Sequence, residues 1–461
     1  MQIYSAFGRM IVFLQLFVIL CFGIVIIALF REKTDFLTYS MVAMLAAATA
    51  TFLFAPESVP IEEFILSIDW PVIFFLISIF TIVVILEEQL IFQEIARRIT
   101  KKFHTNTRQF FWVICLISTL SAAFIEDVSI AVIFIPMIIT TSEKMRINPT
   151  PILLGMTICI NLAATLTPFG SAQNILIANK FSLSTSWFFI NLSVYFITGT
   201  LLTLFLLDFF VLRKHLDEIW IPHCEEYEEP LETEYLEEHE LIIVEEPINP
   251  RVFYRNLVAL FIFFVLLMVI PSILFVGLFG MLLFVFVNPR RSEFNRRKPD
   301  ISYYFSKVDF KLPFFFISLF VLIFCFEKVG LISLIEDFVV NISPNNLFLL
   351  CILVLVITSV LSAFLDNVPV TVLFIPIIQV LTSTFGFSSV PLLLAFILGI
   401  NLGGNFLPQG SAADMMTLDL STKYCVEGMN YRKLLKVGGL FALLHIILGV
   451  GYLALIIFIF F

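Results

Sequence analysis

The sequence reads Ala363-Phe364-Leu365-Asp366-Asn367-Val368 inside one long apolar segment and Ala123-Phe124-Ile125-Glu126-Asp127-Val128 inside another, 240 residues earlier. The same offset, without a gap, relates Phe134-Ile135-Pro136 to Phe374-Ile375-Pro376, Asn161-Leu162 to Asn401-Leu402, and Gly170-Ser171-Ala172 to Gly410-Ser411-Ala412. Chance similarity between apolar segments would not keep polar residues in register. The chain is therefore interpreted as an internal duplication.

The composition places this duplicated chain in a membrane. Hydrophobic residues make up 60% of it and charged residues 14%, with 55 phenylalanines, whereas a soluble domain carries about 25% charged residues. We therefore predict a multi-pass protein of the plasma membrane. The apolar segment Met10 to Phe30 is expected to be the first span and not a cleaved leader, because Arg31 follows it without a small-residue cleavage site.

The predicted fold is an all-α polytopic membrane protein made of two inverted repeats. Each repeat is expected to hold five transmembrane helices, one re-entrant hairpin and a broken helix. The repeats are predicted at residues 1–212 and 251–461, with an acidic cytoplasmic linker at 213–250 that carries 13 acidic and two basic residues. Because five crossings is an odd number, the second repeat should be inverted relative to the first.

The loops give an orientation under this topology. All but three of the 27 Lys and Arg residues (Arg9, Lys180 and Lys328) fall on one face, which the positive-inside rule makes cytoplasmic. Both termini are then expected outside. Two alternatives remain for residues 110–140: two full spans, or a hairpin that reaches the midplane. The hairpin is favoured, because each arm has only about 12 apolar residues, or roughly 18 Å of helix.

Polar interruptions at membrane depth mark the candidate site. Carboxylates and irregular backbone are tolerated there only inside a cavity lined by protein or water. Asp127 and Asn367 are expected to cap the descending hairpin arms, and Ser171 and Ser411 to cap half-helices that follow a proline and a glycine. Four half-helix N-termini should then converge near the midplane, where their positive ends favour an anionic or polar substrate.

The predicted substrate- and ion-binding residues come from both repeats. They are Glu126, Asp127, Asn161, Thr165, Gly170, Ser171, Asn174, Asp366, Asn367, Asn401, Gly403, Gly404, Asn405, Gly410, Ser411 and Asp414. The oxygen-rich subset Asp366, Asn367, Asn401 and Asn405 could hold a sodium ion, or a carboxylate could carry a proton instead. The alternative is that Ser171, Ser411 and Asn161 only cap and hydrogen-bond the broken helices. No cofactor is expected beyond Na⁺ or H⁺ as the coupling ion.

At these residues the sequence resembles the ion transporter superfamily, most closely the arsenite permease, sodium–proton antiporter and P protein group with its citrate transporter-like domain. The motifs that carry the resemblance are Ser362–Pro369, Gly399–Asn405 and Gly410–Ala413. The resemblance implies a homodimer of scaffold and transport domains with an elevator-like movement.

The sequence also departs from this family pattern. Dicarboxylate transporters of the superfamily carry Ser-Asn-Thr at the hairpin tips, whereas this chain reads Glu-Asp-Val and Asp-Asn-Val, which weakens a dicarboxylate reading. Ala163-Ala164-Thr165 stands where the second repeat has Gly403-Gly404-Asn405. We therefore expect the second repeat to bind more of the cargo.

Four transport functions are compatible with these residues. The leading one is an ion-coupled secondary transporter of a small inorganic ion or oxyanion, by Na⁺/H⁺ exchange or arsenite-type export. The second is Na⁺- or H⁺-coupled import of a carboxylate such as citrate. The third is the membrane subunit of an ATP-driven anion pump, whose ATPase would be a separate protein because the chain has no Gly-x-x-x-x-Gly-Lys-Ser/Thr motif. The fourth is a channel, which duplicated broken helices fit less well than alternating access.

An enzyme is not expected, since no His-Glu-x-x-His motif or Cys/His cluster is present in the sequence. The expected partners are the lipid bilayer, a small-ion or anion substrate and a second copy of the chain, with no nucleic acid.

Overall fold

The computed structural model describes residues 2–30, 35–55, 59–103, 106–125, 127–215, 248–270, 272–291, 297–334, 346–365, 367–383, 387–426 and 428–460. Most of the acidic linker, and the hairpin-tip residues Glu126 and Asp366, lie outside these described residues. The predicted domain boundaries at 212/213 and 250/251 therefore stay predictions.

The first half of the chain has only helices among its described regular elements, joined by short turns and loops. It contains α1 (Gln2–Phe30), α2 (Phe36–Phe54), α3 (Ile61–Leu66), α4 (Trp70–Glu88), α5 (Ile91–Phe103), α6 (Thr107–Ala122), α7 (Asp127–Met145), α8 (Thr150–Ala163), α9 (Ala172–Lys180), α10 (Thr185–Leu207), the π-helical turn η1 (Asp208–Leu212) and α11 (Arg213–His215).

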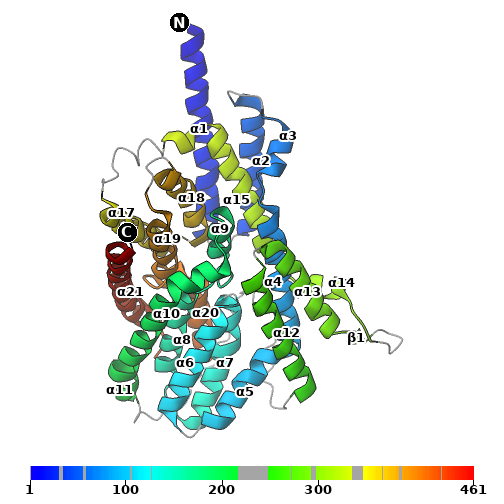
Figure 1. The fold of residues 1–461 in the computed structure, drawn as a ribbon, viewed down its shortest axis with the longest axis vertical. Helices are drawn as coiled ribbons and strands as arrows, with labels where there is room; N and C mark the ends of the chain where they lie inside the picture. The colour runs from blue at the N-terminus through cyan, green and yellow to red at the C-terminus, as the bar shows by residue number, and fades with distance from the viewer. Residues whose placement is uncertain are drawn as a thin grey trace.

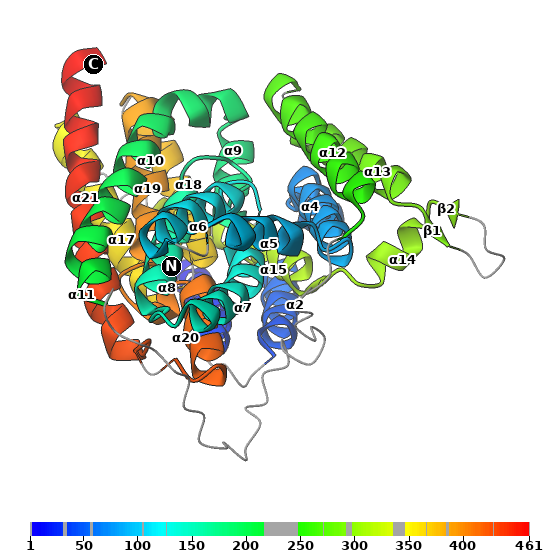
Figure 2. The ribbon, with the colours of Figure 1, turned by 90° about the horizontal axis from the view of Figure 1, so that it is seen from below.

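The second half repeats this programme and adds a short ribbon of two antiparallel strands. It contains α12 (Pro250–Val269), α13 (Ile273–Val287), β1 (Arg290–Arg291), β2 (Arg297–Lys298), α14 (Ile301–Phe305), α15 (Lys311–Lys328), α17 (Leu347–Phe364), α18 (Asn367–Ser383), α19 (Ser389–Gly403), the 3₁₀ turn η2 (Pro408–Gly410), α20 (Ala412–Lys423) and α21 (Tyr431–Phe460). The ribbon projects from the side of the molecule beyond α13 and α14 (Figure 2).

Helix starts recur at the offset found in the sequence. Helices α6 and α17 begin at residues 107 and 347, α7 and α18 at 127 and 367, and α9 and α20 at 172 and 412, each pair 240 residues apart. The local cause is also repeated, because Asn106 caps α6 by accepting from the backbone N–H of Gln109 at 3.0 Å, and Asn346 caps α17 from Leu349 at 3.1 Å. The inverted orientation of the halves stays a prediction.

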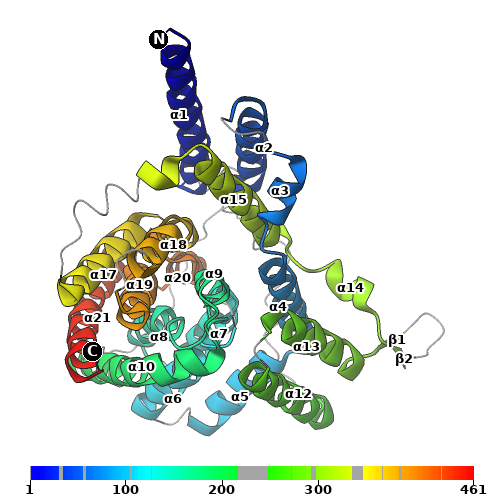
Figure 3. The same ribbon diagram turned by 45° about the horizontal axis from the view of Figure 1, so that its top comes forward.

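The helices form two groups in space (Figures 1 and 3). The central group holds α6–α11 and α17–α21, in which α17 packs against α19, α6 against α8, and α19 against α21. The peripheral group holds α1–α4 and α12–α15, in which α1 packs against α2, α2 against α15, and α4 against α13. The hairpins and broken helices all belong to the central group.

Helix α5 connects the two groups, since it contacts α4 and α12 on one side and α6 and α7 on the other. It is amphipathic and basic, with Arg97, Arg98, Lys101 and Lys102 in its second half. Its Glu94 is buried and accepts hydrogen bonds from Arg97 and Arg98, each at 2.7 Å. The hydrogen bond from Arg97 lowers the pKa of Glu94. The Arg98 guanidinium lies 4.0 Å from the centre of the Phe253 ring of α12, which ties α5 to the peripheral group.

Seven helices among the described residues are long and apolar enough to cross a membrane: Met10–Ala28, Phe36–Phe54, Trp70–Glu88, Thr185–His215, Pro250–Val269, Leu347–Phe364 and Tyr431–Phe460. Large apolar side chains cover their outer faces. Phe13 is 72% exposed and Phe458 77% exposed, which a soluble protein would avoid on this scale. The apolar exterior fits a lipid environment, as predicted from composition.

Both interrupted apolar segments are helix pairs broken at the predicted tips. The first segment is α6 and α7, separated at residues 123–126, and the second is α17 and α18, separated at residues 365–366. The arms are longer than expected, at 16 to 19 residues instead of about 12. Polar residues such as Thr107 and Lys144 extend the helices past their apolar parts. The depth that the tips reach in the bilayer stays a prediction.

Candidate substrate-binding site

Each half contains the predicted broken helix, and the two breaks lie in the middle of the central group. Helix α8 ends at Ala163 and α9 begins at Ala172, whereas α19 ends at Gly403 and α20 begins at Ala412. Every residue of α8 is buried. The first break, residues 164–171, is also buried throughout, which is the condition under which a membrane tolerates irregular backbone. In the second break Gln409 is exposed, while Gly404, Asn405, Gly410 and Ser411 are buried.

The serines at the two N-caps have the same position but different bonds. Ser411 has an extended backbone and its hydroxyl accepts the backbone N–H of Asp414 at 3.4 Å, as predicted for a cap. Ser171 is also extended, but its hydroxyl makes no capping bond and instead donates to Asn401 Oδ1 at 3.4 Å. Both serines thus lie at the beginning of a half-helix, and both reach the opposite repeat.

Glycines let each hairpin tip lie directly on the break of its own half. A Cβ added at Gly170 would lie 3.0 Å from the carbonyl oxygen of Ala123, and one at Gly410 would lie 3.0 Å from that of Ala363. At Gly403 the added atom would lie 2.5 Å from the Ser359 carbonyl oxygen, which is closer than real contacts allow. The predicted glycines therefore serve close packing of helices on the breaks. Gly404 faces the backbone of Gly410 in the same way.

The two breaks exchange an asparagine side chain. Asn161 of the first half donates to Asp414 Oδ1 at 2.9 Å and accepts from Ser411 at 2.8 Å, both in the second half. Asn401 of the second half donates to Asn174 Oδ1 at 2.9 Å and accepts from Ser171, both in the first half. Each bond has an equivalent at the 240-residue offset. The structure therefore brings into contact residues that the sequence comparison had only aligned with one another.

The equivalent positions carry different chemistry. The bond partner of Asn161 is the carboxylate of Asp414, whereas the partner of Asn401 is the amide of Asn174. Asn161 also donates to Asn405 Oδ1 at 2.8 Å, but Thr165, which replaces Asn405 in the first half, donates to Leu162 in its own helix. The buried carboxylate is therefore in the second half, whereas amide side chains occur at both breaks. That the second repeat binds more of the cargo stays a prediction.

The half-helices also pack across the halves. Helix α20 contacts α7, and α9 contacts α18. As a result the first turn of α7, with Asp127, interacts electrostatically with Asp414. Four helix beginnings, those of α7, α9, α18 and α20, thus surround the exchanged asparagines.

The second hairpin tip is tied to the end of α19. The Ser362 hydroxyl hydrogen-bonds with Asn367 Oδ1 and with the Ile400 carbonyl oxygen, the latter at 2.6 Å. Of the proposed sodium ligands, Asp366 lies outside the described residues. Asn367, Asn401 and Asn405 each accept a hydrogen bond at Oδ1. The sodium site stays a prediction. Among the described residues no group of three or more His, Cys, Asp or Glu side chains is placed to hold a metal ion.

Sequence reasoning missed three contributors. Gln173 donates to Asn401 Oδ1 at 2.9 Å, and the hydroxyls of Thr157 and Thr417 lie 2.8 Å apart. Thr157 stands one helical turn before Asn161, and Thr417 three residues after Asp414. Residues three or four positions apart lie on the same face of a helix, so this spacing from Asn161 and Asp414 could have identified both threonines.

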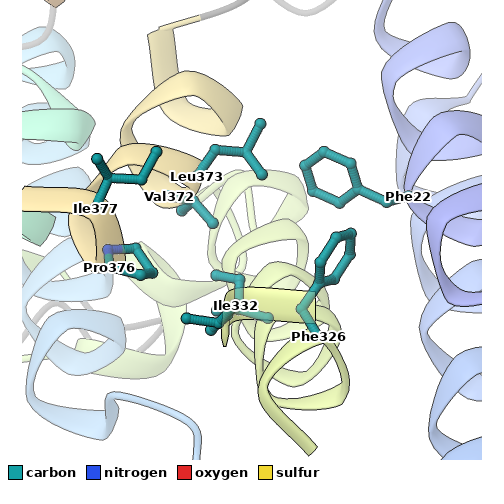
Figure 4. Close-up of a pocket in the computed structure, with 8 residues that line it drawn as sticks. Phe22, Phe326, Ile332, Val372, Leu373, Pro376 and Ile377 are labelled. Atoms are coloured by element: carbon teal, nitrogen blue, oxygen red, sulfur yellow. The ribbon is translucent and has the colours of Figure 1, made fainter. Parts of the chain in front are cut away.

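An apolar pocket lies elsewhere, between α1, α15 and α18 (Figure 4). Phe22 and Phe326 face Val372 and Pro376 across it, at the boundary between the peripheral and central groups. None of the predicted site residues lines it. The residues that line this pocket carry no polar side chain with which to bind an ion. The site at the breaks stays a prediction.

Comparison with known proteins agrees with this architecture. A family model described as a citrate transporter matches residues 22–401 and, separately, residues 264–461. A 46 kDa membrane protein of Mycobacterium leprae is 24% identical over 362 residues, which are 77% of this chain and 79% of that protein. An uncharacterized transporter of Methanocaldococcus jannaschii is 25% identical over 395 residues, 85% of this chain and 91% of that protein.

A solved structure has the same fold. The crystal structure of the YdaH transporter of Alcanivorax borkumensis aligns with a TM-score of 0.63 at 11% sequence identity. The alignment covers 91% of this chain and 97% of that one. At this identity the similarity concerns the fold alone.

Proposed function

The chain belongs to the citrate transporter family, and from that membership we propose that it is an ion-coupled secondary transporter of a small anion. It is a multi-pass membrane transporter, and the proposal concerns its cargo and driving force. The observation that carries the proposal is the exchange of Asn161 and Asn401 between the two breaks. A solute between these breaks would touch both halves of the protein at once, as alternating access requires.

An anionic cargo follows from the helix ends. The beginnings of α7, α9, α18 and α20 lie around the exchanged asparagines, and helix beginnings carry partial positive charge. Oxyanions and carboxylates share the anionic oxygens that such N–H groups bind. Membership of the citrate transporter family favours a carboxylate within this class, although the hairpin tips lack the Ser-Asn-Thr signature.

Exchange of Na⁺ for H⁺ is the second candidate. The interaction between Asp127 and Asp414 favours it, because two carboxylates across one interface attract a cation or a proton. In either case the central group, which holds both breaks, is proposed to move as the transport domain against the peripheral group. The inverted orientation of the halves, the homodimer and the elevator-like movement belong to this proposal. A separate ATPase partner is not part of it.

Proteoliposomes without ATP test the proposal. Labelled citrate, phosphate, arsenite and Na⁺ are offered in turn under an imposed pH or Na⁺ gradient. We expect at least one of them to accumulate against its own gradient, and the Asn401→Ala variant to lose this accumulation. Ile447→Leu, at a 69% exposed position on α21, is the matched control and should transport as the wild type does.

Two outcomes would contradict the proposal. Uptake that only equilibrates the ion, whatever the imposed gradient, would indicate a channel. Uptake that appears only after ATP and a second protein are added would indicate a pump subunit.

A further inference from the structure

Three carboxylates are buried among the described residues, and one of them differs from the other two. Glu94, Asp208 and Asp414 are each 1% exposed. Glu94 lies 2.7 Å from an arginine nitrogen, and Asp208 lies 2.6 Å from Arg108 Nε. Within the described part of the chain, Asp414 forms no such ion pair, and its hydrogen-bond donor is the neutral amide of Asn161. A buried carboxylate without a positive partner is costly in its ionised form.

The first half shows what a neutral side chain does at this position. Asn174 is the counterpart of Asp414 and accepts from Asn401 just as Asp414 accepts from Asn161. In addition, its Nδ2 donates to the carbonyl oxygens of Ala164 at 2.5 Å and Thr167 at 3.1 Å. The Asn174 amide therefore links the beginning of α9 to the backbone of the break that precedes it. An ionised Asp414 has no hydrogen with which to do the same.

A protonated Asp414 would have one such hydrogen. The counterparts of Ala164 and Thr167 are Gly404 and Leu407, the carbonyl-bearing residues of the second break. We propose that Asp414 takes up and releases the proton coupled to transport, and that its protonated carboxyl bonds a carbonyl of the 404–411 break as Asn174 bonds the first break. This assignment rests on the proposed function for its transport role.

The proton cycle needs no other reactant. One Asp414 oxygen forms an O–H bond to a proton taken from water on one side of the membrane. The bond breaks when that proton returns to water on the other side, and no electrons are exchanged. Protonation adds a donor to the break, whereas ionisation removes it and places a negative charge beside backbone carbonyls. The conformation of the second break therefore depends on the proton, while that of the first break does not.

The surroundings of Asp414 contain groups that favour each form. Helix α20 packs against α7, α8 and η2. Of the titratable groups on α7, Asp127 interacts with Asp414 and favours the protonated form. Helix α8 and η2 carry no Asp, Glu, His, Lys or Arg, and the Cys159 thiol of α8 interacts with Cys115 and Thr119 instead. Against these, the first turn of α20 and the Asn161 amide favour the ionised form.

Infrared difference spectroscopy tests the assignment without any transported ion. Full-length protein in lipid is titrated between alkaline and acidic pH, and the C=O stretching band of protonated carboxyl groups is followed. We expect one component of this band to be lost in Asp414→Asn and retained in Asp414→Glu. Asp419→Asn is the matched control, because Asp419 is an exposed carboxylate of the same helix, and it should leave that component in place.

Transport then separates this inference from the proposed function. In proteoliposomes with labelled citrate, phosphate or arsenite, Asp414→Asn should lose accumulation driven by a pH gradient, and Asp414→Glu should recover part of it. A carboxyl band that is the same in Asp414→Asn and wild type overturns the inference, as does pH-driven accumulation that survives in Asp414→Asn. If the band component is lost in the variant but no ion is transported by the wild type, the proposed function fails and the protonation of Asp414 stands.

Discussion

Each broken helix binds an asparagine side chain from the opposite half, but the two breaks bind it with different groups. At the first break, Asn401 meets Ser171, Gln173 and Asn174, all neutral. At the second break, Asn161 meets Ser411, Asn405 and the carboxylate of Asp414. The backbone geometry and the exchanged asparagine are common to both, so they belong to the architecture. A carboxylate stands at this position only in the second break, as Asp414. The broken-helix geometry therefore does not require it, since Asn174 serves in the first break.

The first half thus serves as a reference for the second. Substitutions at two equivalent positions should lower the unfolding free energy equally where both residues only support the shared backbone geometry. The losses should be unequal where one of the two residues contacts Asp414. Pairs of variants at the 240-residue offset can separate the two cases.

The largest inequality is expected between Asn161→Leu and Asn401→Leu. Removing Asn161 takes the amide donor from Asp414, and a buried charged group left without its hydrogen bond costs more than the roughly 1–3 kcal/mol of a neutral one. Removing Asn401 leaves only neutral groups without a partner, at about 1–3 kcal/mol. Chemical unfolding in mixed micelles measures both. The difference should grow as the pH rises and Asp414 ionises; equal losses at every pH would refute the unequal roles.

Gly403→Ala and Ala163→Gly form the next pair. A Cβ at Gly403 would lie 2.5 Å from the Ser359 carbonyl oxygen, and overpacking of this kind costs about 1–3 kcal/mol. Ala163 already carries a Cβ at the equivalent buried position, so its change to glycine should cost about 0.5–1 kcal/mol. Thermal unfolding followed by tryptophan fluorescence compares them, and a larger loss in Ala163→Gly would contradict the packing described for α19.

The capping serines should differ by a smaller amount. Ser411 caps α20 and also donates to Asn161, so Ser411→Ala should lower the unfolding free energy by about 1 kcal/mol. Ser171 makes no capping bond, and Ser171→Ala should cost less. The same micelle assay decides the order, with Ser184→Ala, a cap of α10 outside the site, as the reference for an ordinary capping loss.

The smallest effect is expected at a side-chain hydrogen bond that has no equivalent at the 240-residue offset. Thr157 and Thr417 are bonded to each other, while their counterparts are Ile397 and Ile177. Thr157→Val alone removes the bond to Thr417, whose hydroxyl still donates to the Ala413 carbonyl oxygen, and should cost at most about 1 kcal/mol. The double change Thr157→Val/Thr417→Val should be close to neutral, because the equivalent pair is apolar. A double variant worse than the sum of the singles would give this bond a role beyond stability.

Local chemistry made much of this predictable. The prolines, glycines and serines at 168–171 and 408–411 end and restart helices through their own backbone preferences, so the breaks lie where the sequence placed them. The tips were found from another signal, the polar residues that interrupt an apolar segment and can cap the arm that follows, such as Asp127 and Asn367. Arm lengths were underestimated because apolar residues were counted, while polar residues such as Arg108 and Ser142 continue the helices.

The crossing of the two halves was not predictable from local patterns. Nothing near Asn161 indicates that its amide lies against Ser411 and Asp414, 250 and 253 residues later in the chain. Such contacts depend on how α8 and α20 pack, which one sequence does not specify. Gln173 was missed for a related reason, since its counterpart is Ala413 and the repeat comparison draws attention only to matching residues.

A structure of the full-length protein in lipid nanodiscs, with the ion that the liposome panel identifies, tests the central claim most directly. The account predicts density for the ion between the breaks at 164–171 and 404–411, within reach of Asn161 and Asn401. Ion density in the apolar pocket beside Phe22, or breaks that are straight helices with the two asparagines far apart, would contradict it.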